Sequence, residues 1–139
     1  MELRKSINGR RSGVILTYLF LTGLVLLFEY SKNSLWTSLS IIAEMVLFLG
    51  LIVCFTFFYV RTELWSFIHR PMKMLDEREI ALTGKSLRYA YAIFTVVILS
   101  FLLFLAIWNA AIDVVMVAAL VLFAHLLPAS VIAWTEKEV

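Results

Sequence analysis

Two ionisable residues, Glu44 and His125, each stand within a long stretch of sequence that otherwise has no charge. Placing a charged side chain at the centre of a membrane helix costs about 2.5–3.5 kcal/mol on insertion scales, so such a residue needs a function or a partner. A carboxyl group and an imidazole can both bind and release protons, and a carboxylate also binds cations. The chemistry they predict is proton or cation binding within a membrane, or polar contact between helices.

Glu44 shares one face of a predicted helix with Thr37 and Ser40, and Thr22 lies at comparable depth in the preceding apolar stretch. Under one interpretation, Glu44 is the titrating residue of a proton or cation site. Under the other, which we favour, its carboxyl group hydrogen-bonds to a neighbouring helix or a partner subunit. Two further carboxylates are expected at the same outer membrane surface, where they would attract cations: Glu29 and Asp113.

His125 precedes Pro128 by three residues in the last apolar stretch. Proline leaves the carbonyl four residues earlier without its helical donor, so we expect a kink beside the histidine. This combination is typical of a hinge or a proton relay. The alternative that we favour is structural, with the imidazole bonded to Thr95 or Ser100 on the neighbouring helix. Small residues at helical spacing share its face and suit helix packing: Ala118, Ala129 and Ala133.

The composition indicates where these residues must lie. Of the 139 residues, 63% are hydrophobic and 16% are charged, whereas soluble domains have about 45–50% apolar and about 25% charged residues. A chain of this size cannot bury such an excess of apolar surface in water. The single cysteine, Cys54, also excludes a disulfide scaffold. We therefore predict an integral membrane protein.

Four apolar stretches are long enough to cross the hydrocarbon core, which takes roughly 20 helical residues. They predict helices near residues 12–30, 36–60, 87–108 and 113–134, with a cytoplasmic segment at 61–85. The first two and the last two are joined by short connections, which favour two helical hairpins. The predicted fold is an all-α, integral membrane four-helix bundle that forms one transmembrane domain over residues 1–139.

Lysine and arginine collect in cytoplasmic segments. The two tails and the segment between the second and third helices hold all 12 of these residues except Lys32. Both termini are therefore expected in the cytoplasm. Tyrosine and tryptophan residues are expected at the inner boundary of the membrane, where an apolar ring with a polar tip is favoured: Tyr59, Trp65, Tyr89 and Trp134.

The cytoplasmic segment is long enough to contain a short helix of its own. Pro71 suits the first turn of a helix over residues 72–82, and Gly84 suits its end. Ser86 would then cap the third membrane helix. The basic residues here favour contact with anionic lipid headgroups over nucleic acid.

No catalytic signature is found in the sequence: it has no glycine-rich phosphate loop, no G-x-S-x-G, no H-E-x-x-H and no C-x-x-C. We therefore expect that the protein is not an enzyme. No cofactor is predicted. A metal site is not expected either, because no second histidine or cysteine stands at ligand spacing near His125.

Asp76, Glu77, Arg78 and Glu79 form an acidic-basic element, which is followed by Arg88-Tyr89-Ala90-Tyr91 at the start of an apolar helix. This pattern resembles a family of small prokaryotic multi-pass membrane proteins of unknown activity. The resemblance implies a prokaryotic inner-membrane protein and assigns no activity. The four residues 76–79 are a candidate docking surface for a partner, and the alternative is an ordinary solvated helix.

Two functions follow from these observations. The first is an accessory, regulatory or assembly component of a membrane complex, working as a homo-oligomer or with another membrane protein. The second is a small proton- or cation-coupled transporter that works as a dimer. In the transporter, Glu44 would be the titrating site, and His125 with Pro128 would be the gate.

Overall fold

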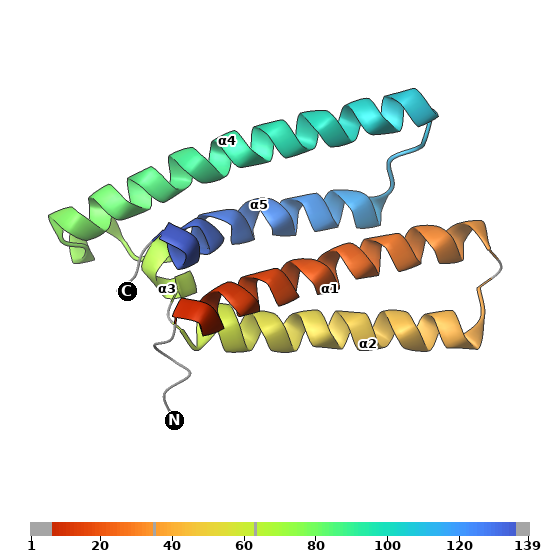
Figure 1. Cartoon of the computed structure of the whole chain (residues 1–139), viewed down its shortest axis with the longest axis horizontal. Coiled ribbons are helices and arrows are strands. Elements are labelled where there is room, and N and C mark those ends of the chain that lie inside the picture. The colour runs from red at the N-terminus through yellow and green to blue at the C-terminus, as the bar shows by residue number, and fades with distance from the viewer. Residues whose placement is uncertain (1–6, 35, 63, 136–139) are drawn as a thin grey trace. The chain divides into compact units, whose positions relative to one another are not determined.

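The computed structural model describes residues 7–34, 36–62 and 64–135, and its secondary structure there is helical (Figure 1). Four of the helices are long and apolar enough to cross a bilayer, which confirms the predicted all-α fold. The chain divides into two compact units, Met1–Leu64 and Trp65–Val139. Each unit contains one antiparallel pair of long helices: α1 (Ile7–Asn33) with α2 (Ser38–Phe55), and α4 (Glu77–Trp108) with α5 (Val114–Thr135).

Glycines let α1 and α2 approach each other closely at two levels of the first hairpin. A Cβ atom on Gly13 would lie 2.2 Å from ring atoms of Phe58, and one on Gly50 would lie 2.5 Å from the ring of Phe20. Neither separation is possible between real atoms. The two aromatic rings therefore occupy the space that side chains would fill, as small residues allow between membrane helices.

The turn between α1 and α2 is closed by an aromatic contact and a helix cap. The ring of Phe28 meets Trp36 edge-on, with centroids 5.7 Å apart. The backbone N–H of Ser40 donates to the Thr37 hydroxyl oxygen at 3.2 Å, and the Thr37 N–H donates to the Ser40 hydroxyl oxygen at 3.1 Å. This reciprocal cap makes α2 begin at Ser38.

The end of α2 widens into a π-helical turn, η1, at Thr56–Val60. The Arg61 N–H donates to the carbonyl of Thr56, five residues earlier, at 3.0 Å. Tyr59 is fully buried, and Cys54 and Leu51 earlier on α2 are nearly so. In a π turn, residues five apart in sequence lie on the same side of the helix. Cys54 and Tyr59 are five residues apart, and both lie on the buried face. Tyr59 lies next to the end of the second candidate span, Ser38–Val60, and its ring is buried within the chain. Its position at the inner boundary of the membrane stays a prediction.

The second hairpin is also closed by local polar contacts. Asn109 ends α4 in the left-handed conformation, with φ 49°, which asparagine tolerates better than most residues. Asp113 then caps α5, because its Oδ1 accepts from the Met116 N–H at 2.8 Å. Phe94 on α4 meets Phe123 on α5 with ring centroids 6.2 Å apart.

The predicted separate helix over residues 72–82 is wrong. Met72–Met74 forms one 3-10 turn, η2, and α4 begins at Glu77 and runs through Gly84 without a break. Gly84 does not have a positive φ, so it does not end the helix. A glycine inside a helix costs only about 1 kcal/mol, which a helix of 32 residues easily sustains. Ser86 is likewise not a cap, because its hydroxyl donates to the Thr83 carbonyl within α4.

A short helix does lie between the second and third long helices, but at α3, Leu64–His69. The indole of Trp65 stacks on the imidazole of His69 with centroids 4.2 Å apart, and His69 Nδ1 lies 2.8 Å from the Trp65 carbonyl oxygen. These contacts one turn apart stabilise a helix that is only six residues long.

We expect Gly13→Ala to lower the free energy of unfolding of the first hairpin by about 1–3 kcal/mol, because the new methyl group overlaps the Phe58 ring. Titration with sodium dodecyl sulfate, followed by circular dichroism, measures this change. Gly23→Ala is the matched control, since its Cβ would lie an ordinary 3.8 Å from Leu47. Equal stability of the two variants would contradict the close approach at Gly13.

Candidate functional site

Glu44 lies on the side of α2 that faces α1. Leu47, one turn later, is within 3.8 Å of the position of a Cβ on Gly23. Leu47 and Gly23 are therefore at the same level of the hairpin. Because the helices are antiparallel, Glu44, three residues before Leu47, lies level with Leu26 and Leu27, three and four residues after Gly23. Of these two leucines, Leu27 is the less exposed. Its Oε1 atom is buried and has no hydrogen-bond partner in the described part of the chain. The structure therefore places a carboxyl oxygen between two apolar helix faces.

The polar residues predicted around Glu44 do not assemble into a site with it. Thr37 and Ser40 bond to one another at the cap of α2, and the Ser40 hydroxyl donates to the Thr37 carbonyl at 2.8 Å. Thr22 is exposed, whereas Glu44 is half-buried. The prediction that Glu44 and Thr22 form one polar site is not supported by this geometry.

The two carboxylates predicted at the outer surface each serve a local structural role. Glu29 Oε1 lies 3.6 Å from the ammonium group of Lys32, one turn later on α1. Asp113 caps α5 in the other unit. Local contacts thus account for both residues, and they give no support to the predicted mouth that attracts cations.

His125 is exposed and lies about 16 Å from the start of α5, near the middle of the helix. Its Nδ1 is 2.9 Å from the Val121 carbonyl oxygen. A carbonyl only accepts, so Nδ1 donates the hydrogen of this bond, and Nε2 has no hydrogen bond in the described part of the chain. The expected bond to Thr95 or Ser100 is not formed, and the Thr95 hydroxyl donates instead to the Tyr91 carbonyl on its own helix.

Pro128 lies in a run of buried residues, 126–130, near the end of α5. The helix continues through it to Thr135. The proline has no N–H to donate to the Ala124 carbonyl, which is the reason to expect a bend of α5 here. A hinge motion at Pro128 stays a prediction. Ala129 and Ala133 are expected from the sequence to share a helix face with His125. Both alanines are fully buried, whereas the histidine is exposed, so the packed surface of α5 includes the alanines and leaves out His125.

The acidic-basic element at 76–79 begins α4. Asp76 accepts from the Glu79 N–H at 2.7 Å, and the Glu79 carboxylate accepts from the Asp76 N–H at 3.1 Å. Two of the four predicted docking residues thus form a capping box, a pattern readable from the Asp-x-x-Glu spacing. Glu77 and Arg78 are exposed and form no part of this cap, so they are the members of the element available to a partner.

The described residues contain no group of three or more histidine, cysteine, aspartate or glutamate side chains placed to hold one metal ion. Comparisons with known protein families, with curated proteins and with solved structures found no match. The fold and composition define a small α-helical membrane protein with four candidate membrane spans.

We expect Glu44→Leu to raise the free energy of unfolding of the isolated chain in detergent by about 1–3 kcal/mol, because it removes a buried oxygen that lacks a partner. Glu44→Gln keeps a polar group in the same place and should change the stability little. Detergent-denaturant titration of the purified chains measures both. A loss of stability in Glu44→Leu would show that the carboxyl group has a bonding partner within the fold.

Proposed function

We propose that this protein is an accessory, regulatory or assembly component of a membrane complex, formed as a homo-oligomer or with another membrane protein. The observation that carries the proposal is His125, whose imidazole is exposed near the middle of α5 with Nε2 unbonded in the described chain. A hydrocarbon environment supplies no hydrogen-bond partner for this nitrogen. A polar group on another membrane helix would supply one.

Residues outside the predicted spans support the same function. Glu77 and Arg78 are exposed in the first turn of α4, where a charged pair can select and orient a partner more than it adds affinity. The resemblance at residues 75–79 also favours an inner-membrane protein of a prokaryote.

The distribution of positive charge supports a cytoplasmic location for both termini. The ends of α1 and α2 that join the tail and the connecting segment carry Arg10, Arg11 and Arg61, whereas the turn between these helices carries only Lys32. Two antiparallel hairpins give an even number of crossings, in agreement with this orientation.

We expect His125→Ala to weaken association in the membrane by about fivefold, which corresponds to about 1 kcal/mol for one interhelical hydrogen bond. The fraction of the chain in larger assemblies is measured by native gel electrophoresis of mildly solubilised membranes. Thr95→Val is the matched control, because the Thr95 hydroxyl is already bonded within α4. An assembly that tolerates His125→Ala as well as Thr95→Val would contradict the proposal.

The second candidate is a proton- or cation-coupled transporter that works as a dimer. The buried, unbonded Oε1 of Glu44 is the observation that favours it, because intramembrane carboxylates commonly belong to ion pathways. The exposed position of Thr22 and the local bonds of Thr37 and Ser40 weigh against a polar path to this group.

Proton flux into liposomes separates these two candidates. For an accessory component, we expect liposomes with the wild-type chain to lose an imposed pH gradient no faster than liposomes with Glu44→Gln. A faster loss that disappears in Glu44→Gln would establish the transporter instead. Circular dichroism of both reconstituted chains controls for folding.

A further inference from the structure

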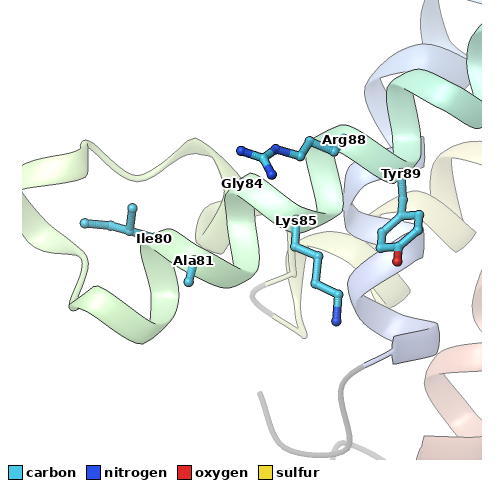
Figure 2. A pocket seen from close by; sticks show the side chains of 6 residues that line it. All are labelled: Ile80, Ala81, Gly84, Lys85, Arg88 and Tyr89. Carbon is cyan, nitrogen blue, oxygen red and sulfur yellow. The ribbon is translucent and has the colours of Figure 1, made fainter.

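An open hollow of about 570 Å³ lies beside the first turns of α4, in the part of the helix that precedes its apolar stretch (Figure 2). Figure 2 shows Lys85 and Tyr89 extending to the same side of the helix, and Arg88 extending back toward the turn of Gly84. The hollow is lined by one short stretch of the chain: Ile80, Ala81, Gly84, Lys85, Arg88 and Tyr89.

Gly84 keeps the hollow open. A Cβ placed on this residue would meet no atom within 4 Å, so no packing requirement explains the missing side chain. The helix also continues through this position without a positive φ. Glycine therefore costs helix stability here and leaves free space next to two cations.

The two cations are exposed, and neither has an ion pair or a hydrogen bond in the described chain. Arg88 and Tyr89 follow Lys85 by three and four residues, which places the Cβ atom of each about 5–6 Å from that of Lys85. Arg88 and Tyr89 are adjacent in sequence and lie on the two sides of Lys85 around the helix (Figure 2). The nearest acidic residue on this face is Glu77, about 12 Å earlier along α4. An ammonium, a guanidinium and a phenol hydroxyl grouped in this way match the oxygens of a phosphate.

The depth of the hollow in a membrane follows from the length of the apolar stretch. Tyr89 to Trp108 contains no charged residue and spans about 30 Å, which is the thickness of the hydrocarbon core. Lys85 and Arg88 then lie at the level of the lipid phosphates. Exposed apolar side chains, Ile93 and Val97, continue along the helix from Tyr89 into the membrane and offer a path for an acyl chain.

We propose that this hollow binds the phosphate of an anionic phospholipid, with Lys85 and Arg88 paired to the phosphate oxygens and Tyr89 donating a hydrogen bond. The site is independent of the proposed role in a membrane complex. The apolar path beside the phosphate position favours a lipid over free inorganic phosphate as the natural ligand.

Native mass spectrometry of the purified full chain, titrated with an anionic or a zwitterionic phospholipid, tests the site. We expect the double variant Lys85→Gln, Arg88→Gln to bind the anionic lipid about 25-fold more weakly, or about fivefold for each cation removed. The control is Arg61→Gln, Lys73→Gln, which removes the same charge from residues that do not line the hollow and should change binding less than about twofold. Equal losses in the two double variants would overturn the proposal, as would no loss in the first.

Gly84→Leu provides a test that leaves every charge in place. Leucine improves helix propensity and fills the hollow, so we expect an unchanged or higher thermal stability together with several-fold weaker binding of the anionic lipid. Binding that is unaffected by Gly84→Leu would show general surface attraction and no headgroup bound in the hollow.

Excess inorganic phosphate should leave the bound lipid in place. Displacement by inorganic phosphate alone would overturn the assignment to a lipid.

Discussion

A polar group inside hydrocarbon has no water to bond with, and this constraint shapes the whole chain. The four long segments are helical, so most of their backbone groups bond internally, as a spanning segment requires. One exception is the Ala124 carbonyl, which Pro128 leaves without its donor. Three hydroxyl side chains within these helices are also bonded internally, because Thr17, Thr95 and Ser130 each donate to a carbonyl four residues earlier. Glu44 Oε1 is buried without a hydrogen-bond partner in the described chain, as are the hydroxyl oxygens of Ser31 and Thr83. His125 bonds only through Nδ1. Glu44 and His125 are the ionisable members of this set that lie deep within an apolar stretch.

Polar residues also define where the helices begin. Thr37 with Ser40, Asp76 with Glu79, and Asp113 each satisfy free N–H groups at a helix start. At Asp76 this local role explains charged residues that otherwise suggest a recognition element. A cap and a binding surface use the same residue types, so the spacing and the observed bonds must distinguish them. Glu77 and Arg78 remain available because they take no part in the cap and are exposed.

Glycine has two opposite uses in the two hairpins. At Gly13 and Gly50 the missing side chain lets an aromatic ring from the neighbouring helix fill the space, which brings α1 and α2 together. At Gly84 the space stays empty beside Lys85 and Arg88. The first use is packing between helices, and the second is an opening at the membrane surface. Both occur within helices, so neither depends on the conformational freedom of glycine.

The sequence by itself determined the membrane class, the four long helices and their short turns, because length and hydropathy act locally along each segment. Only the tertiary structure decided which way each helix face points. It showed Thr22 exposed, Tyr59 buried and His125 bonded to its own helix. Rotation about a helix axis depends on the packing of neighbours, and an apolar helix has no polar face to indicate it. The π turn and the continuation of α4 through Gly84 likewise depended on contacts and caps, which hydropathy does not record.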